Sequence, residues 1–253
     1  RREWEAVERD AALRRGERVK AQVVDGDVLL PLEVQMRGDT SVHWTTEKKT
    51  LRLRTDREAL FKGRRDLVFS VKEVLQQHVS ATLARSVGLL APESEIVPVY
   101  LNRRFYGLAR YLSPVDEGFL RRHDRMPGNV FRGDTAERGE YFKGLPRDLF
   151  RNPPIWDRVA NNDRPGAPRG ALALWLRDMN GGTDADHARF MQWMDRDELA
   201  RLLALVLAVG DPYHMSGVHN QLWYEDPSDG TLHPIAWDLR VLDLERPPPG
   251  SEF

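Results

Sequence analysis

Three residues near the C-terminus, Asp211, Asn220 and Asp238, are of the types that phosphoryl transfer uses. In that chemistry one Asp orients the attacking hydroxyl, while an Asn and a second Asp hold Mg²⁺ against nucleotide phosphates. The segment between Asn220 and Asp238 predicts a hairpin, because residues 221–224 and a later apolar run flank a turn rich in Asp, Ser and Gly. Taken singly, the three residues also suit a loop cap, a turn and the solvated end of a strand.

The same region offers two other chemistries. His214, His219 and His233 are compatible with a three-imidazole metal site on a loop and a neighbouring strand. Asp211 and Asp238 are also compatible with the two carboxylates of a glycosidase. Residue types alone do not decide among these alternatives, so the elements that position the residues have to be considered.

The composition of the 253-residue chain is that of a globular protein, with 41% hydrophobic and 30% charged residues. A net charge of −1 argues against a general nucleic-acid binder and against a polybasic membrane-surface protein. No apolar run approaches the roughly 20 residues that a transmembrane helix needs. The absence of cysteine excludes disulfides and thiolate metal sites. Because the chain starts at Arg1 without a Met, we expect a fragment of a longer protein.

A pair of lysines opens a predicted strand over residues 48–54. Side chains alternate between the two faces of a strand, so Lys49 shares a face with Leu51 and Leu53, whereas Lys48 lies on the opposite face. An ammonium on an apolar face needs an anionic partner, and a nucleotide phosphate would serve. The alternative is a lysine that extends its charged end to water from the start of the strand.

The order of elements predicts an α+β protein with a first lobe over residues 19–133, made of a small antiparallel sheet and one helix. Its expected elements are a hairpin over 19–36, the strand over 48–54, an amphipathic helix over 73–87, a hairpin over 95–112, a short helix over 116–123 and a strand over 129–132. The first hairpin turns at Asp25-Gly26, and Pro31 places its second strand at an edge or bulge. The apolar face of the amphipathic helix consists of Val74, Leu75, Val79, Leu83 and Val87.

Residues 134–253 predict a mainly helical second lobe, and residues 1–18 predict a helical lead-in. A loop-rich stretch over 134–170, with a short helix around 154–161, precedes helices over 171–179, 184–193 and 197–209. Asp195 or Asp197 is the expected N-cap of the last helix. Its expected core positions are Leu199, Leu202, Leu203, Val206 and Leu207.

A series of short motifs then follows in a distinctive order. They are Arg37-Gly38-Asp39-Thr40-Ser41, Lys48-Lys49-Thr50-Leu51-Arg52-Leu53, Leu83-Ala84-Arg85-Ser86-Val87-Gly88-Leu89, Tyr100-Leu101-Asn102-Arg103 with Gly107-Leu108, Gly128-Asn129-Val130-Phe131-Arg132, His219-Asn220 with Tyr224, and Pro234 to Leu239. In this order they resemble the spore coat protein H (CotH) kinase family, an atypical branch of the protein-kinase-like fold. The resemblance spans about residues 30–240.

The resemblance implies a two-lobed kinase-like fold with ATP and Mg²⁺ in the cleft between the lobes. It implies phosphorylation of a protein substrate on Ser or Thr, with no nucleic-acid polymer as partner. It assigns nucleotide phosphates to Arg37, Lys48 and Lys49, the catalytic base to Asp211, and metal ligation to two residues, which are Asn220 and Asp238. Family members are often extracytoplasmic, so we expect a cell-envelope or coat location in a bacterium, with a cytoplasmic location also open.

Several positions depart from the family pattern. Arg240 stands where the family has an Asp, and Ser113 stands where it usually has an acid. Asp211 lies nine residues before Asn220, whereas a protein-kinase catalytic loop spaces them by about five. We expect the helices that would complete the second lobe either to be missing or to lie outside this fragment. These departures leave open a pseudokinase that acts as an assembly or interaction module of a cell surface or coat.

Overall fold

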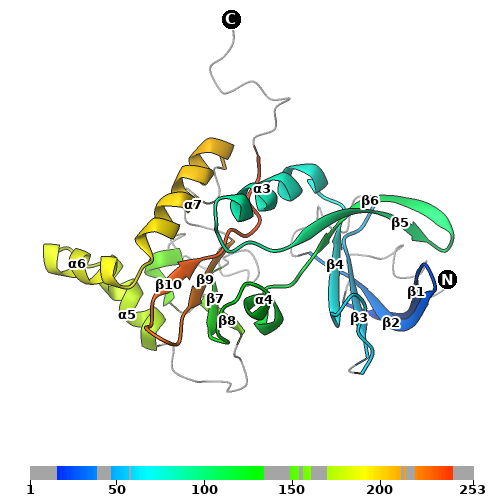
Figure 1. Cartoon of the computed structure of the whole chain (residues 1–253), viewed down its shortest axis with the longest axis horizontal. Coiled ribbons are helices and arrows are strands. Elements are labelled where there is room, and N and C mark those ends of the chain that lie inside the picture. The colour runs from blue at the N-terminus through cyan, green and yellow to red at the C-terminus, as the bar shows by residue number, and fades with distance from the viewer. Residues whose placement is uncertain are drawn as a thin grey trace, which may run out of the picture. The chain divides into compact units, whose positions relative to one another are not determined.

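The computed structural model describes residues 16–38, 47–56, 58–133, 149–153, 156–160, 170–211, 214 and 220–241. The chain divides into two compact units, and each is described by itself. Unit 1 comprises Arg1–His78 and Glu93–Pro114, and unit 2 comprises Val79–Pro92 and Val115–Phe253. Antiparallel sheets and several helices make the protein α+β, as predicted (Figure 1). The expected lead-in helix over 1–18 falls almost entirely outside the described residues.

Unit 1 is built on a six-stranded antiparallel sheet with the order β1-β2-β3-β4-β6-β5. Its strands are β1 (Arg18–Asp25), β2 (Val28–Met36), β3 (Leu51–Thr55), β4 (Asp66–Ser70), β5 (Ser94–Leu101) and β6 (Arg104–Leu112). Both predicted hairpins are confirmed. The first turns through Gly26 at φ +58°, and the second turns through Asn102 and Arg103 at φ +52° and +68°. In the second turn, positive φ at both central residues gives a twist that matches that of the flanking strands.

Two features of this sheet can be compared with the strands predicted from the sequence. Pro31 pairs with Gln22 of β1, while the pairing of β2 with β3 begins only at Leu32. The proline, which has no N–H to donate, therefore lies on β2 where there is only one neighbouring strand. The strand predicted over 48–54 starts later, at Leu51, and β4 was not predicted.

Unit 2 contains a second antiparallel sheet, with the order β10-β9-β7-β8. Its strands are β7 (Asn129–Gly133), β8 (Trp156–Ala160), β9 (Gln221–Glu225) and β10 (Leu232–Pro234). The predicted strand at Asn129 is β7, which pairs with β8 and β9. One expectation was wrong here. The helix expected around 154–161 is strand β8, whose Trp156 is fully buried against the core of unit 2.

The helices of unit 2 agree closely with the predicted ranges. They are α4 (Glu117–Arg122), α5 (Gly170–Met179), α6 (Asp184–Gln192) and α7 (Arg196–Val209). A short 3₁₀ helix, η3 (Leu149–Arg151), lies between α4 and α5 in the chain and contributes Leu149 to the core. Asp195 is the N-cap of α7, where its side chain accepts a hydrogen bond from the N–H of Glu198. Gly210 ends α7 at φ +67°, a left-handed conformation that glycine adopts without a steric cost. No helix within the described ranges is long and apolar enough to cross a membrane.

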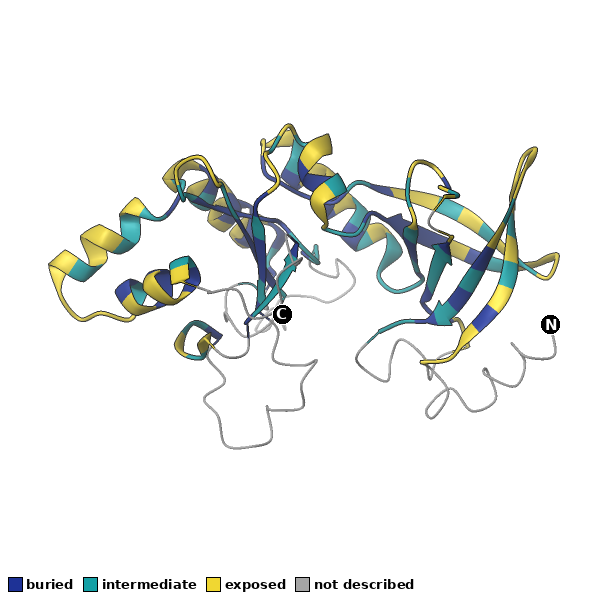
Figure 2. Cartoon of the chain, turned by 90° about the horizontal axis from the view of Figure 1, so that it is seen from below, coloured by how far each residue is buried: buried dark blue, intermediate teal, exposed yellow. Residues whose placement is uncertain are grey.

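Helix α3 (Val74–Ser86) buries the opposite face from the one its pattern predicts (Figure 2). Leu75, Val79, Leu83 and Val87 are exposed, whereas the buried positions are Gln77, Ser80, Ala81 and Ala84. Small side chains allow close packing, and Ala84 contributes to a cluster of unit 2 with the α7 residues Leu202, Leu205, Val206 and Val209. On α7 the expected core positions Leu203 and Leu207 are likewise exposed. The expected positions Leu202 and Val206 are buried, so amphipathic periodicity located both helices and part of the buried face of α7, but not the buried face of α3.

Candidate metal and proton-transfer site

The hairpin β9–β10 carries the candidate metal ligands at its two outer ends. Its strands pair from Leu232 opposite Glu225 to Pro234 opposite Trp223. The turn is closed by Asp226, whose Oδ1 accepts hydrogen bonds from the N–H and the hydroxyl of Ser228 at 2.8 and 2.6 Å. The antiparallel arrangement places the residue before β9 near the segment that follows β10.

Asn220 and Asp238 meet at this end of the hairpin. Nδ2 of Asn220 lies 2.5 Å from Oδ2 of Asp238, and both side chains are half-buried. Both residues also have φ +55°. Among residues other than glycine, Asn and Asp are the ones that most readily adopt this left-handed conformation. Backbone strain of this kind persists only where the surroundings enforce it, and it is concentrated at functional sites.

The segment around Asp238 is fixed by contacts that the residues on either side of Asp238 make with other parts of unit 2. Ala236 donates its N–H to the carbonyl of Leu90 at 2.7 Å, and Ile235 donates to Leu222 of β9 at 2.9 Å. Ala236 and Leu239 are buried in the cluster that α7 forms with the end of α3. The apolar residues on both sides of Asp238 thus anchor the backbone that presents its carboxylate.

Asp211 lies directly after the C-cap of α7 and is fully buried. Its Oδ2 accepts a hydrogen bond from the backbone N–H of Arg240 at 2.8 Å. Its Oδ1 accepts one from the backbone N–H of His214 at 3.3 Å. The carboxylate therefore joins the end of α7 to the segment that starts with Asp238, two residues before Arg240.

His214 is the side-chain partner of Asp211. Its Nδ1 lies 3.1 Å from Oδ2 of Asp211, and the exposed fraction of the imidazole is 5%. Within the described residues, Nε2 on the far side of the ring is buried without a hydrogen-bond partner. Buried polar atoms without partners are rare in native proteins, and a catalytic role is one recognised reason for them.

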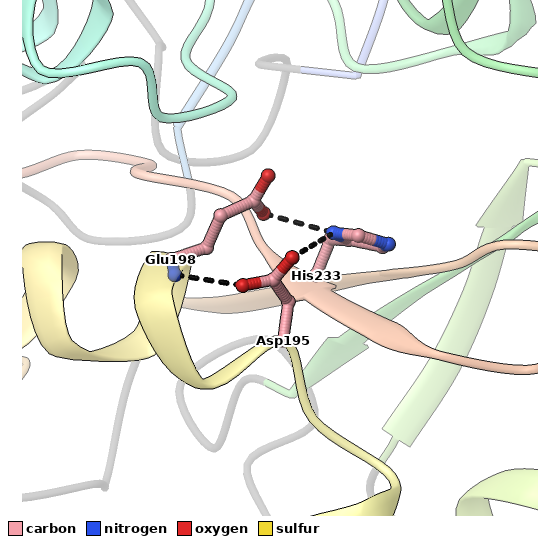
Figure 3. A group of neighbouring side chains, drawn as sticks. All are labelled: Asp195, Glu198 and His233. Atoms are coloured by element: carbon pink, nitrogen blue, oxygen red, sulfur yellow. Dashed lines mark hydrogen bonds and ion pairs between the residues drawn. The ribbon is translucent and has the colours of Figure 1, made fainter.

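A second cluster fixes the hairpin at the other end of α7 (Figure 3). Glu198 Oε2 lies 2.9 Å from Nδ1 of His233 on β10, and Asp195 Oδ2 lies 3.9 Å from the same nitrogen. Their ligand atoms lie within 4.8 Å of one another, as a metal site would require. However, Arg125 already donates to Glu198 Oε1 at 2.7 Å. A guanidinium supplies the positive charge that a cation would bring, so the cluster is a buried ion network that holds β10 against α7.

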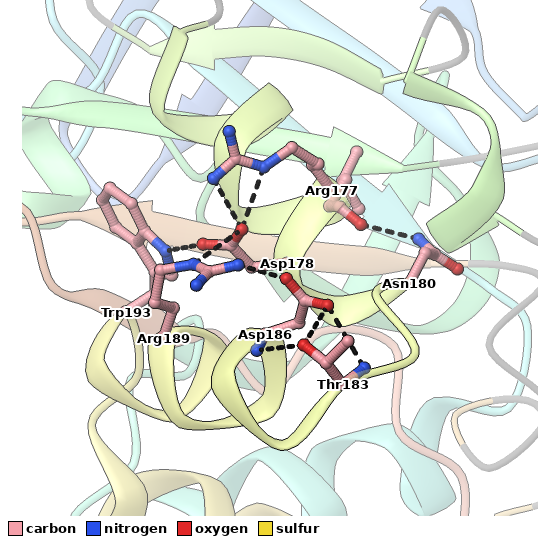
Figure 4. Close-up of polar contacts among 8 residues, drawn as sticks. Arg177, Asp178, Asn180, Thr183, Asp186, Arg189 and Trp193 are labelled. Atoms are coloured by element: carbon pink, nitrogen blue, oxygen red, sulfur yellow. Dashed lines mark hydrogen bonds and ion pairs between the residues drawn. The ribbon is translucent and has the colours of Figure 1, made fainter.

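A further polar network supports the helices beside the second sheet (Figure 4). Asp178 of α5 is buried and accepts hydrogen bonds from Trp193 at 3.0 Å and from Arg177 at 2.6 Å. The Trp193 bond first, and then the Arg177 bond, lowers the pKa of Asp178 below its usual value. Thr183 caps α6 through a reciprocal pair of hydrogen bonds with Asp186. These contacts fix α5 and α6 against each other.

The candidate phosphate ligands belong to unit 1. Lys49 is buried and Lys48 is exposed, as expected, although both residues precede β3 and strand parity therefore does not explain the difference. Both backbone groups of Lys49 bond to the hydroxyl of Tyr106, and the Lys48 side chain passes over Gly107, where a Cβ would lie 2.7 Å from its Nζ. Arg37 donates its backbone N–H to Thr50 at 2.9 Å. The three cationic residues therefore lie at one end of the β2–β3 pair.

The structure thus sorts the predicted residues into three groups. Asn220 meets Asp238, Asp211 meets the Arg240 backbone, and the cationic residues gather in unit 1. The three histidines do not share one set of contacts, because His214 bonds to Asp211, His233 bonds to Glu198, and His219 lies outside the described residues. Sequence reasoning missed the roles of Glu198 and Arg125, because the two residues are 73 positions apart and their pairing gives no local signal.

Comparison with known proteins identifies the family of the chain. A search of curated proteins finds no match to the chain. The family model described as CotH kinase protein matches residues 34–241, a range that includes the lysine pair, Asp211 and the whole hairpin. The chain therefore belongs to the CotH kinase family.

Proposed function

We propose that the protein is a phosphotransferase that binds ATP and Mg²⁺ and phosphorylates Ser or Thr of a protein substrate, within the two-lobed kinase-like arrangement typical of its family. The observation that carries this proposal is the meeting of Asn220 and Asp238, both at φ +55°. Mg²⁺ prefers oxygen ligands and is usually held by one or two protein groups together with substrate phosphates. An Asp carboxylate beside an Asn amide suits that requirement.

Each predicted residue then has a defined task. Asp238 and the amide oxygen of Asn220 would hold the ion, and rotation of the amide about its terminal bond turns that oxygen toward the carboxylate. Bound Mg²⁺ would bridge phosphate oxygens and offset their charge. Lys49, with Lys48 and Arg37, would bind the phosphates. Asp211 would supply the carboxylate of the proton-transfer step.

The direct test compares ligand binding with chemistry in wild type and Asp238→Asn. We expect ATP to raise the melting temperature of the wild type only when Mg²⁺ is present, because ligand at a hundred times its Kd adds about 2.7 kcal/mol of stability. Asp238→Asn should abolish this shift and abolish transfer of labelled γ-phosphate to a library of Ser- and Thr-containing peptides. Asp229→Asn, in the turn of the same hairpin, is the matched control and should behave as wild type. An Mg²⁺-independent shift, or a full shift in Asp238→Asn, would contradict the proposal.

A second candidate function is a pseudokinase that binds nucleotide without transferring phosphate and serves as an assembly or interaction module. Arg240 favours it, because a cation stands where the family has an acid, and Asp211 is fully buried. Under this alternative the Mg²⁺-dependent shift with ATP remains, while labelled phosphate reaches neither the peptides nor the chain itself. The two functions are therefore separated by one pair of measurements.

A further inference from the structure

We propose that His214 is the proton acceptor of this site and that Asp211 is the residue that positions it. The inference rests on the proposed phosphotransfer function and names the atom that removes the proton: Nε2 of His214. It replaces direct action by Asp211, which the family pattern alone would suggest.

The first step concerns the surroundings of Asp211. Its side chain is fully buried, Oδ2 accepts from the Arg240 N–H and faces Nδ1 of His214, and Oδ1 accepts from the His214 N–H. A carboxylate whose two oxygens already accept hydrogen bonds is suited to orienting other groups. A general base, by contrast, must come within about 3 Å of the proton it removes.

The second step concerns the tautomer of His214. A carboxylate accepts but does not donate, so the contact between Asp211 Oδ2 and Nδ1 favours the neutral imidazole that carries its proton on Nδ1. That tautomer leaves a lone pair on Nε2, the buried atom without a partner in the described part of the chain. A Ser or Thr hydroxyl would supply the hydrogen bond that this atom lacks. Carboxylate, imidazole and hydroxyl in series form a familiar arrangement for activating an oxygen nucleophile.

The third step concerns charge. Within the described residues, the charged side chain that contacts the imidazole is Asp211, and Arg240 meets the same carboxylate through its backbone N–H. As the acceptor oxygen bonds to the γ-phosphorus, its proton passes to Nε2 and the Asp211 carboxylate stabilises the imidazolium. The bond from the γ-phosphorus to the bridging oxygen breaks, and ADP leaves with the electron pair. The products are the phosphorylated hydroxyl, ADP and one proton, which His214 later releases to water.

The experiment measures transfer and binding in wild type, His214→Gln and Asp211→Asn. Mg·ATP affinity should stay within about threefold in both variants, while transfer falls by about 10²–10⁴-fold, the usual contribution of a general base. The pH profile of transfer in wild type should differ from that of His214→Gln. Added imidazole should restore part of the activity of His214→Ala, an effect that a merely structural role would not produce. His187→Gln, at an exposed histidine of α6, is the matched control.

A readout independent of activity tests the pair itself. Nitrogen NMR of wild type, assigned with His214→Gln, should show Nδ1 protonated and Nε2 unprotonated, and Asp211→Asn should lose this preference. Wild-type transfer by His214→Gln together with loss in Asp211→Asn would overturn the inference and make Asp211 the base. So would a proton on Nε2 in wild type. If the wild type binds no Mg·ATP, the proposed function is wrong. If it binds Mg·ATP without transferring phosphate, the pseudokinase alternative is supported. The step assigned to His214 is wrong in both cases.

Discussion

Glu198 of α7 and His233 of β10 lie side chain to side chain, with 2.9 Å between Oε2 and Nδ1. Beyond the other end of the same helix, Asp211 accepts the N–H of Arg240. One helix with its flanking residue therefore fixes the hairpin β9–β10 at two places, one on either side of Asp238 in the sequence. This explains how a short hairpin holds its metal-ligand candidates in a strained conformation.

We expect Glu198→Ala to lower the free energy of unfolding by about 2–4 kcal/mol. The carboxylate is buried, and its removal leaves Arg125 and His233 without their partner. Urea denaturation measures the change. Asp197→Asn, at the exposed neighbouring position, should cost less than about 1 kcal/mol. Equal stability of Glu198→Ala and wild type would show that the network does not hold the hairpin.

Asn220→Gly separates the backbone role of Asn220 from its side-chain role. Glycine adopts φ +55° readily, so the free energy of unfolding should change by less than about 1 kcal/mol. Mg²⁺-dependent ATP binding, followed by calorimetry, should weaken at least tenfold, which corresponds to about 1.4 kcal/mol. Asn102→Gly, at φ +52° in the β5–β6 turn, is the control that keeps full binding. Unchanged binding in Asn220→Gly would remove Asn220 from the ligand set.

Acid should destabilise unit 2 through Asp178. The Trp193 hydrogen bond, followed by that of Arg177, lowers the pKa of this carboxyl in the folded state. Its contribution is therefore present above the unfolded pKa, near 4, and is lost as the pH falls through the lower folded value. The melting temperature of wild type should fall over this range more steeply than that of Asp178→Asn. Asp184→Asn, at an exposed position of α6, should follow wild type.

Alkali should act through Tyr224. Burial, followed by the nearby Asp226 charge, raises the pKa of its hydroxyl from 10 to about 12. The neutral form is favoured in the folded state, so this contribution is complete below the unfolded pKa and is lost as the pH rises from about 10 to about 12. Tyr224→Phe should remove this loss of folding stability at alkaline pH, which is on the order of 1 kcal/mol. The variant also lacks the hydrogen bond from the hydroxyl to the Met126 carbonyl. Identical stability curves above pH 10 would contradict the assignment.

The inverted burial of α3 makes a paired prediction. Leu83→Gln should change the free energy of unfolding by no more than about 0.5 kcal/mol, because Leu83 is 41% exposed. Ala84→Leu should cost about 1–3 kcal/mol, because Ala84 is fully buried against α7 and the larger side chain overpacks the cluster. A larger loss of stability in Leu83→Gln than in Ala84→Leu would show that the apolar face of α3 is buried after all.

Features that depend on residues close together in the sequence were predicted well, and features that depend on distant segments were not. The Asp25-Gly26 turn, the Asp195 cap and the bounds of α5–α7 depend on neighbouring residues, and all were predicted closely. The partners of β7 and the buried face of α3 depend on distant segments, so the partners of β7 were not predicted and the buried face of α3 was predicted wrongly. At the candidate site, the order of the motifs identified Asn220, Asp238 and Asp211 as candidate residues. Their contacts with Arg240, His214 and each other appear only once the hairpin is folded.

The division of the chain into its two units has a consequence for expression and folding. Residues 79–92 belong to unit 2 although residues of unit 1 flank them on both sides. Within unit 2, Leu90 accepts the N–H of Ala236, and Ala84, Leu89 and Ala91 complete the cluster around α7. A truncation product starting at Val115 would lack these groups and would expose an unfilled core beside Asp238. The site therefore cannot mature from its C-terminal half alone during synthesis, because it requires a segment translated well before the hairpin itself.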